Sequence, residues 1–297
     1  MSTGNDILCI GSVLWDVIGR AHGPMRLGND VPGRITRLPG GVAMNIAMGL
    51  ARRGLRPVLL TAIGHDAEGD ELLDACAALG LDTRHIHRAP GLPTDRYMAV
   101  ECPEGLVAAI ADAHSLEAAG DAILAPLEDG RLGSPSAPWS GLIALDGNLT
   151  EDLLGEIATR PSFAAADLRI APASPGKAVR LRPLIGHPGA SFYLNREEAG
   201  LILGRSFNSA PEAAAALVSA GVAQVLVTDG AQPAAEGTPQ GLVTASPPRV
   251  SCLRVTGAGD TFMAAHIAAQ AIGLAGEAAL QTALAAAAAY VSGEDSA

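Results

Sequence analysis

A Gly-rich turn directly before an apolar segment is the part of this sequence best suited to chemistry. The turn reads Thr256-Gly257-Ala258-Gly259-Asp260, and the apolar segment runs from Phe262 to about Leu274. We expect that segment to be a helix, so the turn contains its first backbone N–H groups, which have no partner within the helix. The positive end of the helix dipole lies there as well. Small residues let an anion approach such a backbone closely.

Asp260 determines what this turn could do. A carboxylate beside an anion site repels a bound phosphate, unless it takes a proton from the group that attacks the phosphorus. An anion site with an adjacent base is the minimum apparatus for phosphoryl transfer to a hydroxyl group. The alternative is structural, namely a Gly-rich turn whose Asp caps the helix. The turn by itself leaves both interpretations open.

The hydrophobic pattern predicts strands that alternate with helices along most of the chain. Strands are expected at 7–13, 57–64, 81–87, 97–101, 106–111, 141–145, 163–166, 190–194, 222–227 and 241–245, and helices at about 43–53, 70–79, 151–159, 197–203, 210–220, 261–274 and 277–291. Residues 20–38 are expected to be a loop with short strands. The alternation predicts a mostly parallel sheet that is covered on both faces. The hairpin at 97–111 interrupts it and is expected to pack as a flap over a site.

Polar side chains follow several of the predicted strands. These are Asp16, Asn148, Asp167, Asn195 and Thr228. Because the carboxyl ends of parallel strands share one edge of a sheet, we expect them to line one crevice with the turn at 257–260. A second Gly-rich start of a helix, Gly40-Gly41, places Asn45 in the first turns, facing either a ligand or solvent. Together these residues favour phosphoryl transfer.

Composition narrows the classes of function and the compartment. The 297 residues are 48% hydrophobic and carry a formal net charge of −11 without a basic tract, which argues against binding to nucleic acid or to anionic membranes. The length suits one large α/β domain. The four cysteines form no CxxC pair, so neither a zinc site nor a disulfide framework is expected. Free thiols, no signal peptide and no transmembrane segment together predict a cytoplasmic protein.

Four ordered motifs resemble those of the ribokinase-like pfkB family of carbohydrate and nucleoside kinases. They are Gly40-Gly41-Val42-Ala43-Met44-Asn45, Gly64-His65-Asp66-Ala67-Glu68-Gly69, Asn195-Arg196-Glu197-Glu198 and Thr256-Gly257-Ala258-Gly259-Asp260. The resemblance implies a three-layer α/β/α fold with a mostly parallel sheet and a small β lid. Residues 1–297 would form a single kinase domain with lid segments at about 15–38 and 95–113. Family lids often form dimer contacts, which implies a homodimer through the lid.

The same resemblance implies ATP and Mg²⁺ and assigns roles to individual residues. Asp260 would be the base, with Gly257, Ala258 and Gly259 as the anion hole for the transferred phosphoryl group. Asp16, Gly41, Asn45 and Asn148 would bind the acceptor. Asn195, Thr228, Gly230 and Thr256 would lie by the nucleotide, together with Gly257 and Gly259. Glu198 would organise Mg²⁺, through water.

Shorter cues resemble the branch of this family that phosphorylates pseudouridine. They are Pro32-Gly33-Arg34-Ile35, Ala109-Ile110-Ala111-Asp112 and Val255-Thr256-Gly257-Ala258-Gly259-Asp260. They imply a nucleoside acceptor whose 5-hydroxymethyl group is phosphorylated, with Asp112 as a contact to the base or the ribose. Ribose, 2-keto-3-deoxygluconate and adenosine are alternative acceptors.

The sequence departs from the family at two places. Many members carry Asp at the position of Arg254, which helps to shape a monovalent-cation site, so K⁺ activation stays open. The segment 229–233 is poorer in Gly than the family's second nucleotide loop. Two other classes of protein fit less well. A non-catalytic nucleotide- or sugar-binding protein has no need of Asp260, and an NAD-dependent oxidoreductase wants G-x-G-x-x-G where this chain has Gly11-Ser12-Val13-Leu14.

Overall fold

The computed structural model describes residues 6–26 and 28–294, and its centre is an eight-stranded sheet. The strand order is β14-β13-β12-β11-β10-β9-β1-β4, and the pairs from β12 to β4 are parallel. The strands of this sheet are β1 Asp6–Ile10, β4 Arg56–Leu60, β9 Leu142–Asp146, β10 Asp167–Ala171, β11 Ala190–Asn195, β12 Gln224–Asp229, β13 Gln232–Thr238 and β14 Gly241–Ala245. β13 and β14 extend it as an antiparallel edge.

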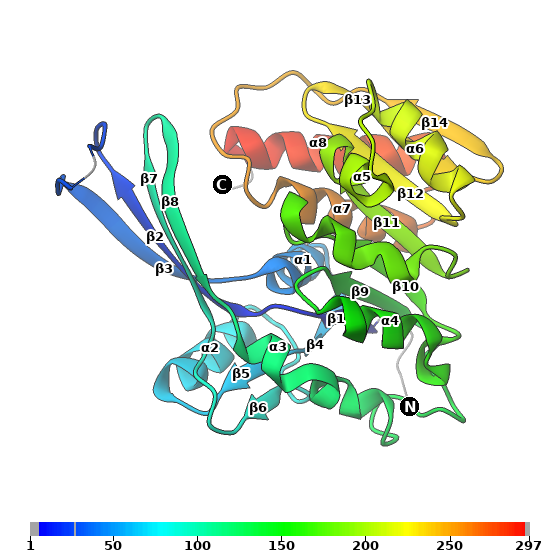
Figure 1. The fold of residues 1–297 in the computed structure, drawn as a ribbon, viewed down its shortest axis with the longest axis horizontal. Coiled ribbons are helices and arrows are strands. Elements are labelled where there is room, and N and C mark those ends of the chain that lie inside the picture. Colours follow the sequence, from blue (N-terminus) through cyan, green and yellow to red (C-terminus); the bar gives the residue numbers. More distant parts are fainter. Residues whose placement is uncertain (1–5, 27, 295–297) are drawn as a thin grey trace.

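Helices cover both faces of this sheet (Figure 1). On one face lie α1 Val42–Ala51, α2 Ala67–Ala78, α7 Ala258–Ala271 and α8 Gly276–Ser292. On the other face lie α3 Ser115–Ala119, α4 Glu151–Thr159, α5 Arg196–Leu203 and α6 Ala210–Ser219, with the 3₁₀ segments Gly120–Leu127, Pro161–Phe163 and Pro175–Leu184. The sequence of β1 is continuously apolar because both faces of the strand are buried. Leu8 and Ile10 pack into one core layer, and Ile7 and Cys9 pack into the other.

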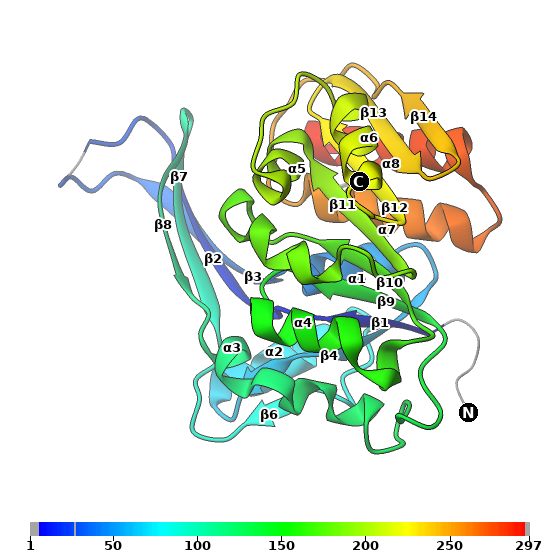
Figure 2. The same ribbon diagram turned by 45° about the vertical axis from the view of Figure 1, so that its right-hand side comes forward.

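A second, smaller sheet projects from the body (Figure 2). Its order is β3-β2-β7-β8, with β2 Leu14–Ala21, β3 Gly33–Gly40, β7 Arg96–Cys102 and β8 Gly105–Asp112. β2 continues from the carboxyl end of β1, and β3 leads directly into α1. The small sheet therefore begins at the edge where the central parallel strands end. A short parallel pair, β5 Ala62–Gly64 with β6 His87–Ala89, lies beneath it.

The three-layer α/β/α prediction is confirmed, and most helices lie where they were expected. Several strand predictions were wrong. Residues 57–64 are two strands, β4 and β5, and only His87 of the expected strand at 81–87 is extended in a sheet. Residues 20–38 contribute to two eight-residue strands, where a loop with short strands was expected.

The prediction that Asp167 ends a strand was also wrong. Residues 161–163 form a 3₁₀ turn, and Asp167 begins β10, at the opposite edge of the sheet from Asn195. Its carboxylate pairs with Arg169 at 2.7 Å. Asp167 therefore lies away from the edge at which the other polar residues meet. Within the described residues, no helix has both the length and the apolar character needed to cross a membrane.

Candidate active site

The Gly-rich turn forms the start of α7, as the sequence predicted. Gly257 is the N-cap residue with φ 87°, a left-handed conformation that favours glycine, and no side chain caps this end of the described helix. A Cβ atom at Gly257 would lie 2.6 Å from the Tyr290 hydroxyl, which donates to the Thr256 carbonyl at 2.8 Å. A Cβ at Gly259 would meet nothing within 4 Å. The turn is thus supported from behind by Tyr290 and open on the side where an anion would bind.

Asp260 lies in the first turn of α7 and accepts a hydrogen bond from Asn45 Nδ2 on α1 at 2.9 Å. Burial raises the pKa of Asp260 to about 7. The Asn45 bond acts in the opposite direction, and the charges of Asp146, Glu198 and Asp16 raise the pKa further. Asp260 is therefore poised to gain and lose a proton near neutral pH, which is what a general base requires.

The start of α1 is held by residues from two other strands. Gly41, the N-cap residue, has φ 98°, and a Cβ there would lie 2.4 Å from the Ser12 carbonyl oxygen. Asp146, fully buried at the end of β9, accepts from Ser12 N at 2.8 Å, from Ser12 Oγ at 2.6 Å and from Ala43 N at 3.3 Å. This carboxylate serves as a helix cap supplied from a distant part of the chain. It sets the position of α1 and therefore of Asn45.

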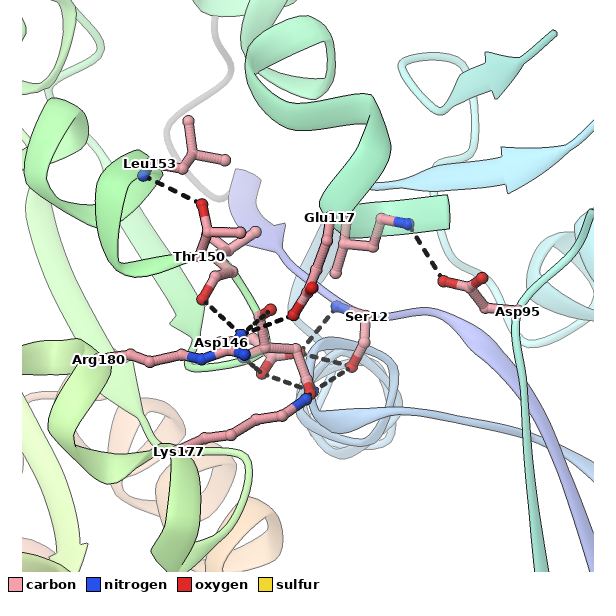
Figure 3. A network of polar contacts seen from close by, with 11 residues as sticks. Ser12, Asp95, Glu117, Asp146, Thr150, Leu153, Lys177 and Arg180 are labelled. Carbon is pink, nitrogen blue, oxygen red and sulfur yellow. Dashed lines mark hydrogen bonds and ion pairs between the residues drawn. The ribbon is translucent and has the colours of Figure 1, made fainter. Parts of the chain in front are cut away.

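Asn148 extends this network to Lys177 and Arg180, whose side chains reach toward Asp146 in Figure 3. Its Nδ2 donates to Ser12 Oγ at 2.9 Å, and its Oδ1 accepts from Lys177 Nζ at 2.7 Å. Arg180, from the same 3₁₀ segment as Lys177, donates to the Asn148 carbonyl at 3.1 Å and to Glu117 of α3 at 2.8 Å. Both hydrogen-bonding groups of the Asn148 side chain are thus engaged within the protein.

Asp16 lies on β2, close to the root of the small sheet. A Cβ at Gly40 would lie 2.0 Å from Asp16 Oδ2, so glycine at 40 makes room for this carboxylate. Burial raises the pKa of Asp16 to about 6. In register, Asp16 pairs with Tyr97 of β7 and Leu38 of β3, so these side chains share one face of the sheet. Burial, and then the charge of Asp16, raises the pKa of Tyr97.

Asp112 lies on the other face of the small sheet. It pairs in register with Arg96, which pairs with Trp15, the neighbour of Asp16 along β2. Since side chains alternate between the faces of a strand, Asp112 points away from the face that Asp16 and Tyr97 share. The structure does not bring Asp112 together with the other predicted acceptor residues.

Asn195 and Glu198 form a reciprocal capping box at the start of α5. Glu198 N donates to Asn195 Oδ1 at 2.9 Å, and Asn195 N donates to Glu198 Oε2 at 2.8 Å. The N-x-x-E spacing therefore has a structural reason in addition to any ligand role. Burial raises the pKa of Glu198 to about 7. Thr228 lies beside Asn195 in register, and Gly230 follows the end of β12.

The donor set at this edge fits a magnesium ion that is held mainly by water and phosphate oxygens. Glu198 supplies a hard carboxylate oxygen, and the described residues contain no group of three or more His, Cys, Asp or Glu arranged as a metal cage. Mg²⁺ keeps several waters and binds one or two carboxylates together with substrate phosphates. An all-protein Mg²⁺ site is therefore not required here.

Arg254 precedes the Gly-rich turn and is held by α8. Its Nε donates to the Tyr290 carbonyl at 2.8 Å, and its guanidinium lies 3.9 Å from the centroid of the Tyr290 ring. A permanent positive charge is thus built in next to the turn.

The structure brings together the predicted residues Asp16, Gly41, Asn45, Glu198 and Asp260 and leaves Asp112 apart. It adds residues that the sequence analysis missed, namely Ser12, Asp146, Tyr97, Lys177 and Tyr290. Two of these residues, Lys177 and Tyr97, are of types that are rare in this sequence, and that rarity could have drawn attention to them. Lys177 is the only lysine in the chain, and Tyr97 is one of three tyrosines in a sequence with 3% aromatic residues. Neither signal indicates a position in space.

Comparisons with known proteins identify the family of the chain. A model of the family described as pfkB family carbohydrate kinase matches residues 5–297. Pseudouridine kinase from Escherichia coli (strain K12) is 35% identical over 94 residues, which is 32% of this chain and 30% of that protein. The uncharacterized sugar kinase YeiI of the same strain is 31% identical over 146 residues, which is 49% of this chain and 39% of that protein. The alignments thus span less than half of these relatives' length.

Solved structures match almost the whole chain. A carbohydrate kinase from Agrobacterium tumefaciens has a TM-score of 0.79 at 25% identity, over 98% of this chain and 94% of that one. Ribokinase from Arabidopsis thaliana, complexed with ribose and ATP, has a TM-score of 0.76 at 20% identity, over 97% and 93%. At this level of identity the ribokinase match shows that the two proteins share a fold.

Proposed function

The chain belongs to the pfkB family of carbohydrate kinases, and from that premise we propose that it is an ATP-dependent kinase of a nucleoside, with pseudouridine as the acceptor. The observation that carries phosphoryl transfer is Asp260. It lies at an open helix N-terminus, is held by Asn45 and has a pKa near 7. A binding protein would gain nothing from a base placed there.

In the proposed reaction, Asp260 takes the proton of the acceptor's 5-hydroxyl group as its oxygen attacks the γ-phosphorus of ATP. The new O–P bond forms as the bond from the γ-phosphorus to the bridging oxygen breaks, and ADP leaves. The backbone N–H groups at Gly257, Ala258 and Gly259 bind the transferred oxygens. Asp16 and Asn45 hold the acceptor hydroxyl groups. Near Glu198 and Asn195, Mg²⁺ supplies charge neutralisation of the phosphates when it is bound.

Tyr97 is the observation that favours a nucleoside over a simple sugar. It shares a face of the small sheet with Asp16, so an acceptor that hydrogen-bonds to Asp16 presents its neighbouring group to the phenol ring. Stacking of a base on an aromatic side chain is worth about 1–3 kcal/mol. The likeness to pseudouridine kinase supports the same class of acceptor. The likeness to a sugar kinase supports a free sugar as the second candidate.

The test is release of ADP from Mg-ATP with pseudouridine, uridine, adenosine, ribose and 2-keto-3-deoxygluconate. We expect saturable turnover on pseudouridine, confirmed by detection of the 5′-phosphate. Tyr97→Ala should then raise KM for the nucleoside by about tenfold and leave KM for any weak sugar acceptor unchanged, because only the base stacks. Tyr97→Phe, which keeps the ring, is the control. Turnover on a free sugar alone would refute the nucleoside acceptor and retain the kinase.

The small sheet is also proposed to close over the acceptor and to bind the small sheet of a second copy. All eight residues of β8 are exposed, and its apolar side chains Leu106 and Ile110 are 61% and 62% exposed. Ile35 of β3 is 77% exposed. Exposed apolar side chains on an edge sheet favour pairing with an equivalent surface. Light scattering should give the mass of a dimer, and Ile110→Glu should give that of a monomer.

A further inference from the structure

Three residues of the Gly64–Gly69 motif converge on one buried threonine. Asp66 accepts from Thr94 N at 2.8 Å and from Thr94 Oγ1 at 2.5 Å, and it also accepts from Gly69 N at 2.8 Å. A Cβ at Gly64 would lie 2.3 Å from Thr94 N, and one at Gly69 would lie 2.7 Å from Thr94 Oγ1. Thr94 itself is 1% exposed. The spacing of the motif therefore serves to seat Thr94 rather than to bind a ligand.

Thr94 lies where the chain enters the small sheet. The next residue, Asp95, accepts at its carbonyl from Trp15 N of β2 at 3.1 Å. The Asp95 carboxylate accepts from Ser115 N at 2.9 Å and from Leu116 N at 3.2 Å, where the chain has returned from β8 into α3 (Figure 3). Residues 94–95 thus join the beginnings of β2 and β7 to the exit from β8.

The first two turns of α2 hold the same sheet at three more points. Trp15 Nε1 donates to the Glu68 carbonyl at 3.0 Å, and Arg96 pairs with the Glu68 carboxylate at 3.0 Å. Arg37 of β3 pairs with Glu71 and lies over the Trp15 ring, 4.2 Å from its centroid. The N-terminal part of α2, with its N-cap residue Asp66, therefore contacts β2, β3 and β7.

We propose that Asp66 is a positioning residue for the acceptor carboxylate Asp16, which it holds in place through Thr94, Asp95 and Trp15. This inference rests on the proposed function. Trp15 directly precedes Asp16, and Tyr97, which pairs with Asp16, is three residues after Thr94. A shift of Thr94 therefore moves both walls of the acceptor site. Asp66 is not one of the residues that we propose to bind the acceptor, and it would act on the reaction through its contacts with Thr94.

The interaction depends on an ionised carboxylate. Burial acts to raise the pKa of Asp66, but the hydrogen bonds from Thr94 and Gly69 and the charge of Arg96 outweigh it and lower the pKa. All of the groups that Asp66 contacts here are donors. In Asp66→Asn, the amide nitrogen would replace one acceptor and face the N–H or O–H of Thr94, so the seat of Thr94 would be disrupted.

The experiment compares Asp66→Asn with Asp70→Asn in the purified full chain. Asp70 lies in the first turn of α2, is exposed, and among its described charged neighbours pairs only with Arg88. The Asp70→Asn substitution therefore removes the same charge as Asp66→Asn without changing a contact to the small sheet. We expect Asp66→Asn to raise KM for the acceptor by about tenfold and to leave KM for ATP unchanged. Asp70→Asn should match the wild type. Equal effects on both Michaelis constants, or an unchanged acceptor KM, would overturn the proposal.

A double-mutant cycle with Asp16→Asn separates positioning from a general loss of stability. If Asp66 acts through Asp16, the loss caused by Asp66→Asn should largely disappear in the Asp16→Asn background. Additive losses would refute the route through Asp16. Should Asp66→Asn fail to fold, Thr94→Val removes the single hydroxyl bond while keeping the shape, and Thr94→Ser, which keeps the hydroxyl, is its rescue.

Tryptophan fluorescence gives a readout that needs no acceptor. The chain has two tryptophans, so Trp139→Phe leaves Trp15 as the single reporter, bonded to the Glu68 carbonyl. In that background, Asp66→Asn should shift the emission of Trp15 to longer wavelength by admitting water, and Asp70→Asn should not. A shift without turnover on any acceptor would refute the proposed function and retain the Asp66 contact, while an unchanged emission would refute the contact itself.

Discussion

Replacing Asn45 with leucine should move the pH dependence of turnover upward. Asn45 Nδ2 donates to Asp260 Oδ2 at 2.9 Å and is the contact that lowers a pKa which burial has raised to about 7. A hydrogen bond to an ionised group contributes about 1.5–3 kcal/mol. One pKa unit corresponds to about 1.4 kcal/mol. Without this bond, the pKa of Asp260 should therefore rise by about one to two units.

The sign of the effect follows from the proposed role of Asp260 as a base. Only the ionised carboxylate accepts a proton, so activity is lost as the pH falls through its pKa. At pH 7 about half of the wild-type carboxylate is ionised, compared with about 1–10% in the variant, so turnover should fall by about 5- to 50-fold. At pH 9 the two proteins should agree to within about twofold.

The assay is direct chromatographic measurement of ADP, with both substrates saturating, between pH 5.5 and 9.5. Asp16 and Glu198 also titrate in this range, with pKa values of about 6 and about 7, so the comparison with wild type isolates the effect on Asp260. Asn208→Leu, an exposed asparagine before α6, is the matched control. Saturating substrates remove any effect of Asn45 on acceptor affinity from the comparison. A loss of equal size at every pH would therefore refute the reasoning, because it would mean that Asn45 affects the geometry of the reacting groups rather than the proton affinity of Asp260.

Three further predictions test other parts of the site. Asp260→Asn should lower turnover by about a hundredfold or more while calorimetry still detects ATP binding; near-normal turnover would remove Asp260 from the mechanism. Asp146→Asn should lower the free energy of unfolding by about 2–4 kcal/mol in urea titrations, since the amide nitrogen would face the N–H and O–H donors that now bind the buried carboxylate. Turnover should be equal in K⁺ and in choline salts, because Arg254 already places a positive charge on Tyr290 beside the turn, and a K⁺ requirement in the wild type would contradict this.

The layers of the fold were predictable because most central strands are continuous apolar runs between turn residues. β10 was not, and Arg169 explains why. Asp167-Leu168-Arg169-Ile170-Ala171 places a charged residue in the middle of a buried strand, where Asp167, Tyr193 and Gln270 satisfy its guanidinium group. Charged residues are seldom buried unless they are paired. The partners come from three different elements, so no local pattern reveals the strand.

The candidate site was predictable to the extent that it consists of ordered motifs, as with Gly41, Asn45 and Asp260. Asp146 and Ser12 escaped notice because their role is tertiary: a carboxylate on β9 caps a helix 103 residues earlier in the chain. Tyr97 required the register of β2 with β7, which the sequence does not specify. Asp112 also required the register, since Asp112 pairs with Arg96 and its neighbour Ala111 pairs with Tyr97, which places Asp112 on the opposite face of the small sheet.

The acidity of the site raises the question of how it binds a phosphate. Its one lysine neighbour, Lys177, is bonded to Asn148, and the chain has no other lysine. The raised pKa values offer an answer. With values of about 6 to 7, Asp16, Glu198 and Asp260 carry less negative charge near neutral pH than ordinary carboxylates. In the proposed reaction, Asp260 takes the acceptor's proton and so loses the charge that would repel a phosphoryl group at the start of α7. The burial that raises the pKa of Asp260 therefore makes it a stronger base and also reduces its electrostatic repulsion of the phosphate. Proton transfer to Asp260 and binding of the phosphoryl group thus favour each other.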